Sequence, residues 1–177
     1  MPLDRLSALY GRLLEALAWL ACVMVFAMVL VICGDVLLRN AALIPSVRGL
    51  GWANDLTEAG LYLTTMLAAP WLLRRGQHIR VDIVLRAIPK RLAWHCEWFA
   101  DSAGLACCLV MVWYGAKMTL ASYGAGAMSV KTLVTPEWWL LAPLPIAFAL
   151  LAAEMLFRMR RLLQGERGPR EDAVSAA

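Results

Sequence analysis

The stretch that decides the fold is an uncharged run of nineteen residues, Ala16–Gly34, which reads ALAWLACVMVFAMVLVICG between two acidic residues. Its centre, residues 23–32, contains only aliphatic residues, Met, Phe and Ala. About 20 apolar residues in a helix cross the hydrocarbon core of a bilayer. The apolar region of a cleavable signal peptide is shorter, about 7–15 residues, and ends in a small-residue cleavage site that is missing here. The run therefore predicts a transmembrane helix over residues 14–38.

Three shorter apolar runs follow, at residues 59–73, 102–116 and 138–153. Runs of about 15 residues are marginal as membrane spans on their own. Tryptophan rings favour the headgroup level of a bilayer, however, and most Trp residues of this chain lie near the ends of the runs. They are Trp52, Trp71, Trp94, Trp98, Trp113, Trp138 and Trp139. With about one interfacial turn added, the runs predict three further spans, over residues 52–73, 94–116 and 136–157.

The composition agrees with a membrane protein and excludes a soluble enzyme. Of 177 residues, 62% are hydrophobic and only 17% are charged, where a soluble domain carries roughly 25% charged residues. The net charge of +4 would suggest nucleic-acid binding only if the basic residues were grouped on a soluble module. We therefore predict an all-α integral membrane protein with one four-helix transmembrane domain, residues 1–163, and a polar, disordered tail, residues 164–177.

The distribution of basic residues predicts the orientation, because Lys and Arg of short loops are retained on the cytoplasmic side. Thirteen of the 17 basic residues fall in the N-terminal segment, the second loop and the C-terminal segment. The other four are Arg39, Arg48, Lys117 and Lys131. This split predicts that both termini lie in the cytoplasm, which requires an even number of spans.

The second loop carries an amphipathic pattern between residues 79 and 92. Its apolar residues recur at helical spacing, with the basic residues largely on the other side; they are Val81, Val84, Leu85, Ile88 and Leu92. Such a segment favours a short helix along the inner interface of the membrane. Pro89 is expected to mark the bend into the third span. The alternative, a basic loop that only sets the orientation, explains the charge but not the periodicity.

Ionisable residues inside a span are costly and suggest function by default, but most here lie near span ends. Asp55 and Glu58 occupy the first turns of the second span, where acidic side chains complement the helix terminus. Glu154 and Arg158 are spaced for a local i,i+4 ion pair. Asp101 has no basic neighbour at that spacing, so it is the better candidate for a contact with another helix or subunit.

Prolines and cysteines complete the pattern. Pro70, Pro143 and Pro145 interrupt the second and fourth spans and favour kinks, and the order Thr135-Pro136-Glu137 predicts N-cap, N1 and N2 of the fourth helix. The five cysteines have neither metal-type nor redox-type spacing, so we expect no disulfide, metal or cofactor.

The sequence resembles the small membrane (Q-type) subunit of tripartite ATP-independent periplasmic (TRAP) transporters. The best match is the run from Arg74 to Asp82, RRGQHIRVD, which resembles the family's basic, Gly, His-Ile, Val-Asp signature after the second span. Upstream, DVLLR over residues 35–39 is similar to the family's exit from the first span. WANDL over residues 52–56 resembles the Trp and paired-acid start of the second, with Asn54 where an acid is more usual. TPEW over residues 135–138 is similar to the entry of the fourth. The resemblance covers residues 10–163.

The resemblance implies a complex with a large membrane subunit and a periplasmic substrate-binding protein, in the bacterial inner membrane, that imports organic acids with a sodium gradient. It implies that the substrate and sodium sites belong to the large subunit and that the small subunit is a scaffold and not an enzyme. Nucleic acid is not an expected partner; the lipid bilayer is. We take as candidate interface or structural residues Arg39, Trp52, Asp55, Glu58, Arg74, Arg75, Gly76, His78, Asp82 and Asp101. Our hypothesis is that the loop residues among them fix the second span, the interfacial helix and the partner relative to one another.

Two other functions fit a small multispan chain. A haem-bearing respiratory anchor needs axial ligands inside its spans, usually histidines, but the two histidines, His78 and His95, lie in or beside the second loop. A small multidrug-type exporter has four spans and can use one membrane carboxylate for proton coupling. Glu15 would have to fill that role, yet it precedes the first apolar run. An unrelated four-helix membrane scaffold is the remaining alternative.

Overall fold

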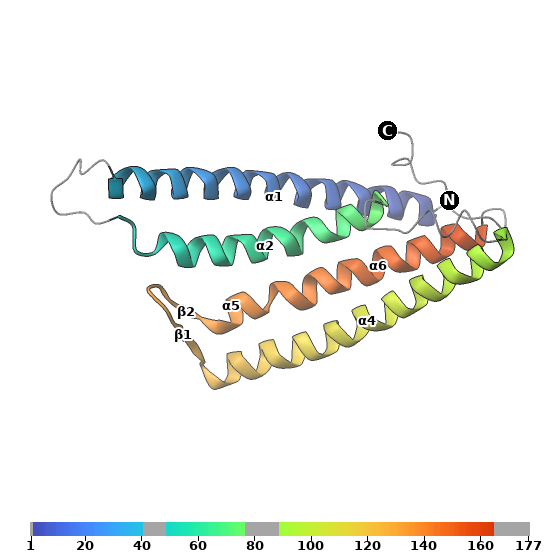
Figure 1. The fold of residues 1–177 in the computed structure, drawn as a ribbon. Helices are drawn as coiled ribbons and strands as arrows, with labels where there is room; N and C mark the ends of the chain where they lie inside the picture. The colour runs from blue at the N-terminus through green and yellow to red at the C-terminus, as the bar shows by residue number, and fades with distance from the viewer. Residues whose placement is uncertain (1, 41–48, 77–88, 165–177) are drawn as a thin grey trace.

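The computed structural model describes residues 2–40, 49–76 and 89–164, and these residues form helices joined at one end by a short hairpin (Figure 1). The elements carry the labels of Figure 1. The helices are α1 (Pro2–Asn40), α2 (Ala53–Arg74), α4 (Lys90–Ala125), α5 (Glu137–Leu141) and α6 (Pro143–Gln164). The strands are β1 (Met128–Val130) and β2 (Val134–Pro136).

The four long helices lie side by side in the order α1, α2, α6, α4 (Figure 1). Each helix packs extensively on its neighbour in this row, whereas α1 and α4, on the outside, have no comparable contact within the described residues. α1 begins, α2 ends, α4 begins and α6 ends at the same end of the row, which we call the N-end. The opposite end, where the strands lie, is the hairpin end.

The predicted spans correspond to real helices with shifted ends. α2 agrees with the prediction within a residue at each end, but α1 begins at Pro2, well before residue 14, and α4 runs from Lys90 to Ala125 instead of 94–116. Pro89 precedes α4 as its N-cap. Residues 90–92, which we assigned to the interfacial helix, belong to the start of α4.

The entry into the fourth span differs from the prediction. An antiparallel hairpin joins α4 to α5, with Ser129 opposite Thr135, so the fold is not purely helical. Thr135 is therefore a strand residue, and Pro136 takes the N-cap position without any side-chain cap. The predicted interruption does occur: α5 ends at Leu141 and α6 begins at Pro143.

The apolar side chains are mostly on the outside of this row. The buried apolar residues among those described are few and mostly small, such as Ala21, Ala147 and Ala152, whereas Trp19, Phe26 and Trp113 are each at least 66% exposed. Without a hydrophobic driving force between helices in lipid, small residues favour close packing of backbones. Within the described residues, three stretches are long and apolar enough to cross a membrane: Ser7–Asn40, Leu92–Ala125 and Glu137–Leu163.

α2 is not among these three apolar stretches. It carries Tyr62, Thr64 and Thr65 near its middle, with Pro70 in its last turns. It also lies between α1 and α6 in the row, so less of its surface faces outward than that of the two outer helices.

Close packing between α4 and α6 makes one position on α4 sensitive to size. A Cβ atom at Gly115 would lie 2.5 Å from Leu144 Cδ2 and 3.3 Å from Pro145 Cδ. Gly115→Leu is therefore expected to destabilise the protein by about 1–3 kcal/mol through overpacking. Gly124, on the same helix, has open space around it and provides the matched control, Gly124→Leu. Thermal unfolding in detergent measures the difference, and equal melting temperatures for the two variants would contradict this packing.

Several sequence predictions concern residues outside the described ranges. These are the interfacial helix over residues 79–88, the signature residues His78 and Asp82, and the disordered tail from residue 165, since Gln164, the predicted first residue of that tail, is the last residue of α6. They remain predictions.

Candidate functional site

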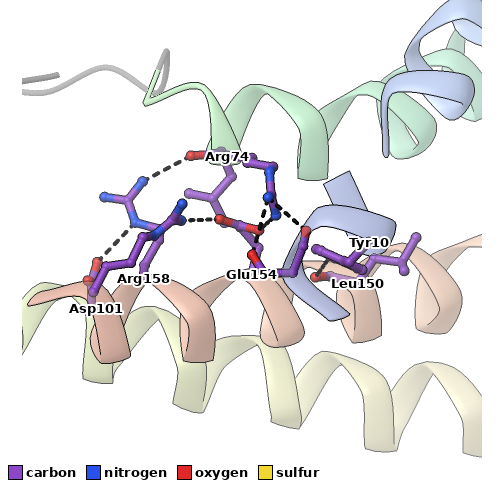
Figure 2. Close-up of polar contacts among 9 residues, drawn as sticks. Tyr10, Arg74, Asp101, Leu150, Glu154 and Arg158 are labelled. Atoms are coloured by element: carbon purple, nitrogen blue, oxygen red, sulfur yellow. Dashed lines mark hydrogen bonds and ion pairs between the residues drawn. The ribbon is translucent and has the colours of Figure 1, made fainter. Parts of the chain in front are cut away.

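A cluster of charged side chains joins the helices at the N-end, and its centre is Glu154 of α6 (Figure 2). This carboxylate is fully buried, with 0% exposure. Its Oε2 atom accepts a hydrogen bond of 3.1 Å from Arg74 of α2, and its Oε1 atom pairs with Arg161, two turns further along α6. A buried charge is tolerated only when it is paired and hydrogen-bonded, and here two guanidinium groups meet that need. We call Glu154, Arg74, Arg161, Arg158 and Asp101 the arginine cluster.

Arg74 extends the cluster to α1. Its Nη2 atom donates to the backbone oxygen of Ser7 at 2.9 Å and lies 3.3 Å from the Ser7 hydroxyl. Its guanidinium carbon lies 5.8 Å from the centre of the Tyr10 ring. The planar guanidinium group has several donors in a fixed fork, so this one side chain connects α2 to both α1 and α6.

Two residues of α1 make room for Arg74 and fix its position. A Cβ atom at Gly11 would lie 3.0 Å from Arg74 Nη2, so a larger residue would push the guanidinium away. The Tyr10 hydroxyl donates to the backbone oxygen of Leu150 at 2.6 Å, which joins α1 directly to α6 (Figure 2). The Tyr10 ring also packs against Phe157, with ring centres 5.5 Å apart.

Arg158 of α6 extends the cluster to α4. Its Nε atom lies 3.7 Å from Asp101 Oδ1 of α4, and its Nη1 atom donates to the backbone oxygen of Leu73 at 3.0 Å. Asp101 is 6% exposed and contacts another helix, as the sequence suggested. The predicted local pair of Glu154 with Arg158 is wrong, because Glu154 binds Arg74 and Arg161 instead. The arginine cluster therefore holds all four long helices at the N-end.

A second set of polar contacts lies at the hairpin end, where Asp35 of α1 binds the segment before α2. Asp35 of α1 accepts hydrogen bonds from Arg39 at 2.9 Å and from the backbone N–H of Leu50 at 2.5 Å. Gly49 has a φ of +93°, and a Cβ atom there would lie only 2.7 Å from Asp35 Oδ1. Arg39 thus supports the acidic residue that binds the chain just before α2.

The acidic start of α2 contacts the hairpin, so it does more than complement the helix terminus. Asp55 Oδ2 accepts a hydrogen bond of 3.1 Å from the backbone N–H of Leu133, and Glu58 lies 2.6 Å from Lys131. Both contacts are exposed, and exposed ion pairs contribute only about 0–1 kcal/mol. They position the hairpin against α2 without adding much stability.

The other predicted residues have smaller roles in the described structure. Arg75 lies 4.7 Å from the centre of the Trp71 ring and 3.7 Å from Glu15. Gly76, with a φ of +69°, follows the last turn of α2. Trp52 is the N-cap residue of α2, but its side chain makes no capping hydrogen bond. Sequence reasoning missed Ser7, Tyr10 and Arg161, whose only signal was their position near span ends.

In the part of the chain that the structure describes, these polar groups make contacts between helices and form no evident catalytic arrangement. Among residues 2–40, 49–76 and 89–164, no group of three His, Cys, Asp or Glu side chains is placed to hold a metal ion. Glu15, the carboxylate a proton-coupled exporter would need, is 57% exposed and lies beside Arg75 at the N-end. This position gives the exporter hypothesis no support.

Comparison with known proteins identifies the family. The sequence model described as "Tripartite ATP-independent periplasmic transporters, DctQ component" matches residues 28–165, which is most of the chain. The chain belongs to this family. It is therefore a small permease component of the TRAP transporter type, in agreement with the resemblance seen in the sequence. No curated protein matches the chain.

The family assignment places the arginine cluster in context. The matched range includes α2, α4, α5, α6 and the last third of α1, residues 28–40, so it covers all five residues of the arginine cluster. Ser7, Tyr10 and Gly11, which the cluster uses on α1, precede the matched range. The assignment to a transporter component, in place of an exporter or a haem anchor, rests on the matched range as a whole.

Proposed function

We propose that this DctQ-type chain is the scaffold subunit of a sodium-coupled TRAP transporter. In this proposal it holds a large membrane subunit in the bacterial inner membrane, and that partner imports an organic acid delivered by a periplasmic binding protein. The family match carries the proposal. The arginine cluster supports the scaffold role, because it holds four long helices at one end by contacts that leave no evident substrate site among the described residues.

The outer surface of the row supports a role in assembly. Large apolar side chains are exposed along α1 and α4, including Phe26, Phe99 and Trp113. In a membrane such faces contact either lipid tails or another membrane subunit. Sodium coupling and substrate binding would then belong to the partner, and this chain would bind neither a cofactor nor a metal.

The proposed arrangement in the membrane has four spans. They are the three long apolar stretches and, in addition, α2, despite its lower hydropathy. Both termini and the N-end face the cytoplasm, in line with the thirteen basic residues of the N-terminal segment, second loop and C-terminal segment. The hairpin end then faces the periplasm. An interfacial helix over residues 79–88 remains part of this proposal.

Cysteine labelling tests this arrangement. With the five native cysteines replaced by serine, Lys131→Cys should react with an impermeant reagent added outside the cell, whereas His78→Cys should react only after the membrane is permeabilised. The two positions lie on opposite sides of the proposed spans. Strong outside labelling at position 78 with none at position 131 would reverse the orientation.

Reconstitution tests the function. In proteoliposomes the chain alone should transport nothing, because it lacks an evident substrate site. Together with its large membrane partner and the binding protein, it should support uptake that requires an inward sodium gradient. Omitting only this chain should remove that uptake and serves as the control. Substrate flux through the isolated chain would contradict the scaffold role and favour the exporter.

A further inference from the structure

A hollow of about 360 Å³ lies beside the arginine cluster, between α1, α2 and α6. Four arginines line it, Arg12, Arg74, Arg75 and Arg161, together with Glu15 and Trp71. We call it the basic hollow. Four guanidinium groups around so small a space repel one another unless anions lie among them.

The carboxylates nearby do not balance this charge. Glu154 neutralises part of it by pairing with Arg74 and Arg161, and Glu15 lies 3.7 Å from Arg75 in an exposed pair. Two carboxylates therefore face four guanidinium groups, and Arg12 has no ion pair with the described residues. The hollow thus favours an anion with several acceptor oxygens, since guanidinium forks match phosphate geometry.

A second hollow identifies the kind of anion. This groove of about 690 Å³ lies between α1 and α6 and is lined by Leu9, Tyr10, Leu13, Ala153 and Phe157. Arg12 lines both hollows, so the apolar groove begins where the basic hollow ends. A free phosphate ion would make no contact with such an apolar groove, whereas the acyl chain of a lipid would fill it. Trp71 in the basic hollow is also typical of the headgroup level of a bilayer.

We propose that the basic hollow binds the phosphate headgroup of an anionic phospholipid, whose acyl chain lies in the apolar groove between α1 and α6. The phosphate oxygens accept hydrogen bonds from Arg12 and Arg75, whose ion-pair partners among the described residues are absent for Arg12 and exposed for Arg75. Basic pockets between transmembrane helices are known to select such headgroups. The bound lipid reduces the repulsion among the four arginines and connects α1, α2 and α6 at the N-end of the row.

The test uses the full-length chain purified in a neutral detergent and probed with long-chain phosphatidylglycerol, long-chain phosphatidylcholine and inorganic phosphate. Binding is measured by native mass spectrometry, and stability by thermal unfolding. We expect phosphatidylglycerol to bind and raise the melting temperature, phosphatidylcholine to bind much more weakly, and inorganic phosphate to have little effect. Equal binding of the two lipids, or a phosphate effect as large as that of phosphatidylglycerol, would overturn the proposal.

Variants locate the site. Arg12→Gln with Arg75→Gln removes two exposed arginines outside the buried pairs, so the fold should persist, and unfolding without lipid checks this. If each residue contributes as basic groups near anionic lipid do, affinity for phosphatidylglycerol should fall roughly 30-fold. Arg160→Gln removes one charge from the same end of α6 without lining either hollow, so it should lower affinity much less than the double variant does. Equal losses in both variants would show general attraction and overturn the site.

Discussion

Replacing Glu154 with Gln is expected to lower the free energy of unfolding by about 3–5 kcal/mol, because it removes the buried carboxylate that two guanidinium groups share. Glu154 is fully buried and pairs with both Arg74 and Arg161. Glutamine keeps the size of the side chain, so the change tests charge and not packing. For a chain of this length the melting temperature should fall by roughly 6–20 °C in detergent, and less folded protein should be recovered from the membrane.

The control for this experiment is Glu15→Gln. Glu15 also pairs with an arginine near the N-end, but its side chain is 57% exposed and its contact with Arg75 is 3.7 Å. Exposed pairs contribute about 0–1 kcal/mol, so this variant should melt close to the wild type. If Glu154→Gln melted as the wild type does, the arginine cluster would not hold the helices together.

The sequence was informative about the spans because hydrophobicity is a local property. The run from Ala16 to Gly34 predicts a membrane helix without reference to any other part of the chain. The ends of the helices were less predictable, since α1 continues through Arg5 and Arg12, which an apolar criterion excludes. Helical structure can continue beyond the apolar run, because the backbone hydrogen bonds that define a helix do not depend on side-chain polarity.

The partners within the arginine cluster were not predictable from one sequence. Spacing along α6 favours a pair between Glu154 and Arg158, because residues four apart share a helix face. The helix that each of these two residues contacts depends on the order of the helices in the row. Here α2 and α4 lie on opposite sides of α6, so Arg74 reaches Glu154 and Asp101 reaches Arg158. That order is a property of the whole fold.

The hairpin escaped prediction for another reason. Its strands have only three residues each, too few to show the alternation of apolar and polar residues that identifies a strand. The end of α4, just before the hairpin, has a clearer local cause. Gly126 adopts a φ of +61°, and its N–H and that of Ala127 bond back to Tyr123 and Ser122, which ends α4 as a Schellman motif.

Replacing Arg74 is expected to have an effect as large as that of Glu154→Gln, and here the conservative change is the more informative. Arg74→Ala should lower the free energy of unfolding by about 3–5 kcal/mol, because Glu154 then keeps only Arg161. Arg74→Lys retains the charge but has a single ammonium group. Arg74 uses two different nitrogens, one toward Glu154 on α6 and one toward Ser7 on α1. Lysine cannot reproduce this fork.

We therefore expect Arg74→Lys to recover only part of the lost stability and to release α1 selectively. Hydrogen exchange should report this as faster exchange in the first turns of α1, around Ser7, with little change in α6, where Arg161 still neutralises Glu154. Arg39→Lys is the matched control, since Arg39 pairs with Asp35 at the hairpin end and is exposed. It should leave exchange near Ser7 unchanged. Wild-type exchange and stability in Arg74→Lys would mean that charge alone, without the guanidinium fork, joins α1 to the other helices.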